Sequence, residues 1–170
     1  MSKSRSDKFT IWSAFRESNF SGKISLILST WFGIGLLPVA PGTFGTIAAF
    51  PLVFGLTCFG TVSGVFIIVM GMAVAIWASA QSEELLCDSD PSEIVIDEVV
   101  GFLLTLFLLP LSWLTIGLGF ILFRVFDILK PYPIKEAEKL RGGLGIVMDD
   151  LVAGFYAHVC VRLVLYFVKS

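Results

Sequence analysis

Twenty consecutive residues, Thr61 to Ala80, carry no charged side chain, and this stretch constrains the fold more than any other feature of the sequence. A helix of about twenty apolar residues is long enough to cross the hydrocarbon core of a bilayer. Hydrophobic residues make up 56% of the chain and charged residues only 15%, whereas a soluble domain carries about 25% charge. The sequence therefore predicts an all-α integral membrane protein, a helical bundle covered partly by lipid.

Residues 24–170 are predicted to form one membrane-embedded domain, preceded by a polar N-terminal tail at residues 1–23. Within the tail, Phe9, Trp12 and Phe15 recur every three residues beside basic side chains, which is typical of a short interfacial helix. A partly ordered tail is the alternative interpretation.

Lysine and arginine are concentrated in two segments. Five of the twelve lie in the first 23 residues, and five more lie between Arg124 and Arg141. Because loops rich in Lys and Arg stay on the cytoplasmic side, both segments are predicted to face the cytoplasm, where they would attract anionic lipids. Nucleic acid is not expected as a partner, since no compact basic stripe interleaved with aromatic residues occurs.

Prolines and glycines indicate where the helices break. Two prolines and two glycines are expected to exclude a regular helix from residues 38–46. Pro110 divides the apolar segment 99–123, a helix resumes near Ser112, and Pro131 ends it. A polar glycine-rich loop is expected at residues 142–145, with the last helix beginning near Asp149.

Acidic residues at the ends of apolar helices carry the chemical information. Asp97 and Glu98 open one helix, and Asp149 and Asp150 are expected to open another. Helix capping explains either pair alone, but two adjacent carboxylates repel each other and fit a cap less well.

Asp127 lies between Arg124 and Lys130, at a spacing of three that places neighbouring members on one helix face. A charge-neutralising ion-pair ladder is the alternative, yet ionisable groups near lipid usually mark a site. Carboxylates of this kind can hold Mg²⁺, and the cations can offset charge on a phosphoryl group. The backbone of the loop around Thr43 could also approach a phosphate, although its spacing alone favours a simple turn that links two helices. Together these features predict a metal-assisted phosphatase. Its expected metal-binding and catalytic residues are Asp97, Glu98, Asp127, Asp149 and Asp150, and its expected substrate-binding residues are Thr43, Arg124 and Lys130.

Four motifs, in order and with similar gaps, resemble the bacterial phosphatidylglycerophosphatase A family. They are Gly35–Gly45 (GLLPVAPGTFG), Asp97–Gly101 (DEVVG), Phe123–Ile134 (FRVFDILKPYPI) and Gly142–Gly154 (GGLGIVMDDLVAG). The resemblance implies a Mg²⁺-dependent enzyme of the bacterial inner membrane that converts phosphatidylglycerophosphate to phosphatidylglycerol and inorganic phosphate. The family pattern is intact at Asp97, Glu98, Asp127, Lys130, Asp149 and Asp150. It does not say which acid binds metal and which acts as the base.

A shared site restricts the topology. If Asp97 and Asp127 meet, residues 99–126 must leave and return to the same face of the bundle, as a re-entrant hairpin buried in protein. A small transporter and a non-catalytic membrane subunit are the alternatives. A transporter would carry acids near the middle of long crossings, often in repeated halves, and a subunit would not require acidic pairs at separate places. The sequence does not reveal the oligomeric state or the number of full crossings.

Overall fold

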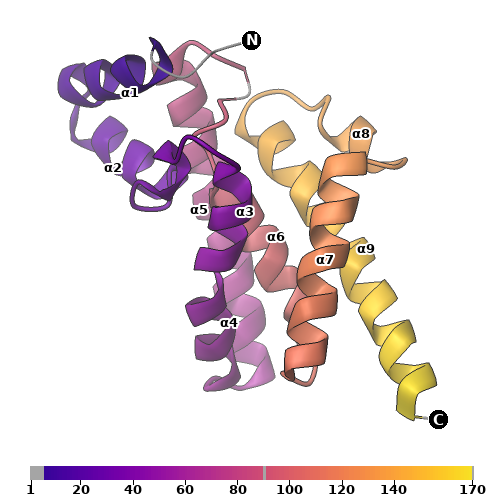
Figure 1. The fold of residues 1–170 in the computed structure, drawn as a ribbon. Coiled ribbons are helices and arrows are strands. Elements are labelled where there is room, and N and C mark those ends of the chain that lie inside the picture. Colours follow the sequence, from indigo (N-terminus) through magenta and orange to yellow (C-terminus); the bar gives the residue numbers. More distant parts are fainter. Residues whose placement is uncertain (1–5, 90, 170) are drawn as a thin grey trace.

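The computed structural model of the protein describes residues 6–89 and 91–169, and these residues form helices without any strand (Figure 1). The all-α prediction is confirmed. The first five residues of the predicted tail, including Lys3 and Arg5, lie outside the described residues. The elements in chain order are α1 (Ser6–Glu17), α2 (Phe20–Ser29), the 3₁₀ helix η1 (Ile34–Leu36), α3 (Pro41–Ala48), α4 (Phe50–Thr57), α5 (Thr61–Leu86), α6 (Ile96–Leu106), α7 (Trp113–Leu129), α8 (Ile134–Ala137) and α9 (Gly143–Lys169).

Two of the described helices are long and apolar enough to cross a membrane, namely Thr61–Leu86 and Gly143–Val168. Each has 26 residues in that span and extends about 39 Å at 1.5 Å per residue. The other described helices have 17 residues or fewer. Figure 1 shows α1, α2 and α8 at one end of the bundle and the C-terminus at the other, so both basic segments lie at the same end.

Helices α6 and α7 form the hairpin that the shared site requires. Helix α6 has 11 residues, the chain turns at residues 107–112, and α7 begins after Ser112, whose hydroxyl accepts a hydrogen bond from Thr115 N. All residues of α6 are buried except Glu98 and Leu104, which are half-buried. The short helix is therefore enclosed by protein, as a non-spanning segment in a membrane must be.

Helix α9 lies against α5, α6, α7 and α8. Its closest approach to α6 occurs where Gly154 faces Gly101: a Cβ on Gly101 would lie 2.7 Å from Asp150 O, and a Cβ on Gly154 would overlap Gly101 O. Asp97 and Asp150 each precede this crossing by one helical turn. The small residues thus bring the acidic ends of two helices together.

Two expected boundaries are wrong. Residues 38–46 are not free of helix, because α3 begins at Pro41, where proline occupies the first helical position and its missing N–H costs nothing. The last helix begins at Gly143 rather than near Asp149. Gly143 packs so closely against Ile76 O and Ala80 N of α5 that any Cβ would overlap them, so tertiary packing overrides the weak helix propensity of glycine.

Candidate active site

Three carboxylates meet where α6 begins beside the second turn of α9. Asp97, Glu98 and Asp150 each offer one oxygen, and these oxygens all lie within 4.8 Å of one another. Asp97 is 9% exposed and Asp150 is 3% exposed. Asp97 Oδ1 and Glu98 Oε2 are buried and have no hydrogen-bond partner among the described residues. Buried carboxylates so close together are stable as anions only with a cation between them, and oxygen ligands of this kind suit Mg²⁺.

The pKa values of these acids also indicate a place for a cation. Burial, reinforced by the neighbouring Glu98 charge, raises the pKa of Asp97 well above its ordinary value. Burial and the Asp150 charge raise the pKa of Glu98 to about 8. The protein alone therefore favours the protonated acids near neutral pH, and a bound cation would favour the ionised acids instead.

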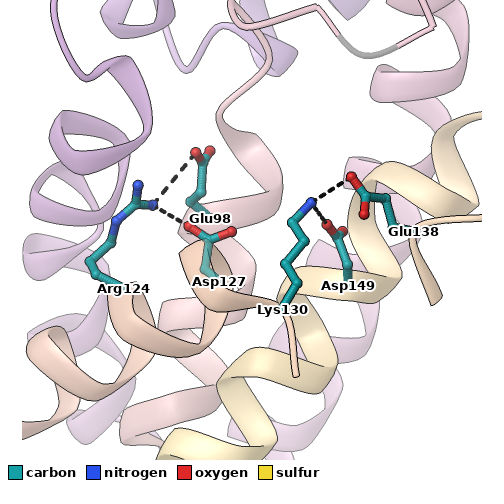
Figure 2. Close-up of polar contacts among 6 residues, drawn as sticks. All are labelled: Glu98, Arg124, Asp127, Lys130, Glu138 and Asp149. Atoms are coloured by element: carbon teal, nitrogen blue, oxygen red, sulfur yellow. Dashed lines mark hydrogen bonds and ion pairs between the residues drawn. The ribbon is translucent and has the colours of Figure 1, made fainter. Parts of the chain in front are cut away.

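Arg124 and Asp127 of α7 extend the group on one side. Arg124 Nη1 lies 2.7 Å from Asp127 Oδ2 and 3.8 Å from Glu98 Oε1, as Figure 2 shows. The Asp127 carboxyl also lies close enough to that of Asp150 for the two charges to interact. Although its charge is paired, Arg124 has buried Nε and Nη1 atoms without an aligned hydrogen-bond acceptor in the described part of the chain. Its guanidinium therefore retains donors that a phosphate oxygen could satisfy.

Lys130 lies on the other side and contacts a different acid. It ends α7 with a left-handed backbone (φ 42°), and its Nζ lies 2.7 Å from Asp149 Oδ2 and 2.8 Å from Glu138 Oε1 (Figure 2). Burial alone would lower the pKa of Lys130, but the hydrogen bonds to Asp149 and Glu138 outweigh burial and raise it. Lys130 thus pairs with α9 and the α8 segment rather than with Asp127, which is one turn earlier.

The start of α3 covers Glu98 and Arg124. A Cβ on Gly42 would overlap the Glu98 carboxylate and would lie 3.3 Å from Arg124 Nη1. Thr43 follows in the same turn and is half-buried. The first backbone N–H that bonds within this helix belongs to Phe44, which donates to Ala40 O at 3.3 Å. The N–H groups of Gly42 and Thr43 therefore come before the hydrogen-bonded part of the helix, at the end that attracts anions.

The structure thus brings the sequence-predicted residues to one end of the bundle, in two neighbouring sets. Asp97, Glu98, Asp127, Asp150 and Arg124 form one set, and Lys130 with Asp149 forms the other. Glu138 is an additional member that the sequence analysis did not identify. It lies among several charged residues after Pro133, and nothing in that pattern separates it from a solvated surface acid.

Comparison with known proteins identifies the family. Residues 27–165 match the sequence model of phosphatidylglycerophosphatase A. The chain belongs to the phosphatidylglycerophosphatase A family. It is similar to the phosphatidylglycerophosphatase A of Escherichia coli (strain K12), with 34% identity over 144 residues that cover 84% of this chain and 81% of that protein. It is also similar to the protein of the same name from Haemophilus influenzae, with 38% identity over 169 residues, 88% of this chain and 97% of that one.

A third relative of the chain has a different name. It is a candidate phosphatidylinositol-3-phosphatase of Bacteroides thetaiotaomicron, 34% identical over 150 residues, which cover 81% of this chain and 91% of the relative. No solved structure matches the chain. Family membership and the two long apolar helices together identify a membrane-associated protein.

Proposed function

We propose that this protein hydrolyses the terminal phosphate monoester of phosphatidylglycerophosphate, giving phosphatidylglycerol and inorganic phosphate in phospholipid biosynthesis. Family membership supports the lipid phosphatase activity. The observation on which the mechanism depends is the buried group of Asp97, Glu98 and Asp150, with an unpartnered oxygen on each of the first two. A small transporter or a non-catalytic subunit would not require such a group beside a cation with free donors.

The carboxylates fit Mg²⁺ as the metal cofactor. Asp97, Glu98 and Asp150 would hold it, because their oxygens lie within 4.8 Å of one another and hard oxygen donors are what Mg²⁺ selects. When bound, the ion would polarise the phosphoryl group and offset its negative charge. Asp149, which the sequence analysis also included among the metal ligands, is held by Lys130 and is proposed to support the site from its edge.

Residues of the chain would orient the phosphate. Arg124 would donate hydrogen bonds to its oxygens through the nitrogens that have no aligned acceptor. The N–H groups of Gly42 and Thr43 would add donors at the positive end of α3. Lys130 would approach from the α9 side, still paired with Asp149. Donors fixed in advance around the phosphate stabilise the charge that develops on its equatorial oxygens.

Asp127 is the proposed proton acceptor. A water oxygen forms the new bond to phosphorus as the bond from phosphorus to the glycerol oxygen breaks. The water must release a proton, and the glycerol oxygen must gain one. Asp127 lies close to Asp150 and is oriented by Arg124 at 2.7 Å, so its carboxylate is placed beside the proposed metal site and has a fixed direction. It would accept the proton from the attacking water, while the leaving glycerol oxygen, on the opposite side of phosphorus, would take its proton from solvent water; the proton on Asp127 would then return to solvent.

The active site is proposed to face the cytoplasm from the bacterial inner membrane. The start of α6 and the end of α7, which carry site acids, lie toward the end of the bundle where α1, α2 and α8 are found (Figure 1), and loops rich in Lys and Arg stay on the cytoplasmic side. A lipid substrate would then present its head group to the site from the same leaflet.

Phosphate release from phosphatidylglycerophosphate by the purified protein tests the proposal. The assay is run with Mg²⁺, with chelator, and with Asp97→Asn, Asp127→Asn and Asp150→Asn. Lys139→Gln is the matched control, because Lys139 lies on the surface, paired only with Glu136. Magnesium-dependent release that each acid variant loses, while the control keeps it, is the expected result. Release that survives in all three folded acid variants would refute the site. Phosphatidylinositol 3-phosphate as a second substrate tests the head group named for the B. thetaiotaomicron relative.

A further inference from the structure

An apolar recess lies outside the acidic site, between α1, α2 and the turn that contains η1. Its volume is about 270 Å³. Among the side chains that line it are Ile11, Trp12, Phe15, Leu26, Ile27 and Phe32. Trp12 and Phe32 remain 62% and 69% exposed, so the recess is open rather than part of the core. No step of the proposed hydrolysis uses it.

Each of the two helices that line this recess carries a cation next to Phe15, one of the lining residues. Lys23 Nζ is 5.8 Å from the centre of the Phe15 ring, and Arg16 follows Phe15 on the exposed side of α1. Within the described residues, neither cation forms an ion pair, and Glu17 does not pair with them. Lys23 precedes Leu26 and Ile27 by three and four residues, so the positive charge and the apolar wall share one face of α2.

The recess also has a defined place in the fold. Helix α2 packs on the end of α5 through hydrogen bonds from Ser21 to Gln81 (3.1 Å) and between Ser29 and Ser82 (2.8 Å). Figure 1 shows α1 lying across this end of the bundle. The recess therefore lies where the apolar part of α5 ends, at the same end as the acids. At such a position, aromatic and basic side chains meet lipid head groups.

We propose that this recess binds an anionic phospholipid at a site separate from the catalytic one. The head group contacts Arg16 and Lys23, and the first part of an acyl chain lies against Trp12 and Ile27. Such a contact docks the active-site end of the protein on the anionic leaflet. The unpaired cations favour an anionic lipid over a second copy of this chain. The proposal does not depend on the hydrolytic function, because it can be measured without turnover.

Quenching of Trp12 fluorescence by brominated lipids tests this site. The full-length protein is placed in nanodiscs with chelator present, with either brominated phosphatidylglycerol or brominated phosphatidylcholine at matched mole fractions. The signal of Trp12 is the difference between the parent and Trp12→Phe. Each basic residue near an anionic surface contributes about a fivefold preference. We therefore expect the anionic lipid to quench Trp12 at a several-fold lower mole fraction than the zwitterionic lipid.

The charge variants decide the result. Arg16→Gln combined with Lys23→Gln is expected to abolish the preference for anionic lipid, whereas Lys135→Gln combined with Lys139→Gln, which removes the same charge elsewhere, is expected to retain it. Equal quenching by both lipids in the parent would overturn the anionic site. No quenching of Trp12 by either lipid would overturn lipid binding altogether, and in that case protein-concentration-dependent cross-linking through the recess would identify a second copy as its occupant.

Discussion

Replacing Gly42 with alanine is expected to disable the enzyme with a single methyl group. A Cβ at this position would overlap the Glu98 carboxylate and lie 3.3 Å from Arg124 Nη1. Non-bonded heavy atoms normally stay about 3.5 Å apart, so the carboxylate must move by more than about 1 Å. The φ of Gly42 is outside the left-handed region, since the glycines with positive φ in the described chain are Gly33 and Gly142. Alanine therefore adopts this backbone without strain, and the effect is confined to the site.

The magnitude follows from the displacement. A misplacement of about 1 Å at a reacting group costs on the order of 100-fold in rate, which corresponds to about 2.7 kcal/mol of transition-state stabilisation. We expect Gly42→Ala to lower kcat/KM for phosphatidylglycerophosphate by about that factor and to raise the Mg²⁺ concentration needed for half-maximal rate. Both quantities are measured by phosphate release in mixed micelles over a range of Mg²⁺ concentrations.

Two further glycines in the same bundle serve as controls. Gly117→Ala places its Cβ where no atom lies within 4 Å, and it should retain parental kcat/KM. Gly45→Ala lies on the same helix as Gly42, but its Cβ would be 2.9 Å from Val95 Cβ. It should lower thermal stability much more than it lowers kcat/KM. A folded Gly42→Ala variant with parental kcat/KM and Mg²⁺ dependence would refute the conclusion that α3 fixes Glu98 and Arg124 for catalysis.

A second substitution can rescue the first. Glu98→Asp shortens the acid by one methylene and leaves room for the new methyl group. The double variant Gly42→Ala with Glu98→Asp should therefore lose less activity than the product of the two single losses. A double variant whose loss of activity equals the product of the two single losses would show that the two positions do not interact, contrary to the overlap in the structure.

Three other results are expected. The folded-state pKa of Asp97 and of Glu98 is raised, the latter to about 8, so the metal-free protein binds more protons when folded than when unfolded. Its free energy of unfolding should therefore fall as pH rises from about 5 to 8, by at most about 1.4 kcal/mol per pH unit for each acid. In thermal unfolding in detergent, Mg²⁺ should stabilise the protein strongly at pH 8 and weakly at pH 5, and equal stabilisation at both would contradict this. Arg124→Lys should lower kcat/KM by about 100-fold, because an ammonium group lacks the planar set of donors, and activity near the parental level would argue against phosphate contact. His158→Ala should lower the thermal unfolding midpoint and leave KM unchanged. It removes the contacts of His158 Nδ1 with Thr105 O (3.1 Å) and of His158 Nε2 with Arg162 Nε (2.8 Å) and leaves polar groups unpaired, which costs about 1–3 kcal/mol. An unchanged midpoint would show that these bonds are not needed for stability.

Hydropathy and charge position predicted much of this fold and site. The uncharged run from Thr61 predicted α5, Ser112 and Pro131 bounded α7, and the acids at the start of α6 indicated the site. The hairpin of α6 and α7 was predicted from chemistry alone, because Asp97 and Asp127 can share a site only if the chain returns to the same face. The observed hairpin confirms that argument.

The features that the sequence did not predict depend on contacts between distant segments. Pro41 and Gly42 read locally as helix breakers, yet both belong to α3, and only a residue without a side chain fits at position 42 against Glu98. Gly143 begins α9 for a similar reason, through its packing on α5. Glu138 differs from other surface acids only in reaching Lys130 at 2.8 Å. Propensity describes a residue and its neighbours along the chain, and each of these outcomes is decided by another helix.

The short central helix explains how a charged site and a membrane fold coexist in this chain. A straight crossing of residues 99–126 would place Asp97 and Asp127 on opposite faces of the bilayer. Instead, α6 ends within the protein after 11 residues, and α7 returns to the level of the first acids. The beginnings of α3 and α6, which favour anions, then meet the end of α7 beside the second turn of α9. Among the described residues, the acids that are buried as whole residues are Asp97, Asp149 and Asp150; all three are at this level, and the half-buried Glu98 is beside them. This arrangement suits a lipid phosphatase, because its charged groups lie close enough to lipid to meet a phosphate ester, and a bound cation would keep the buried acids ionised.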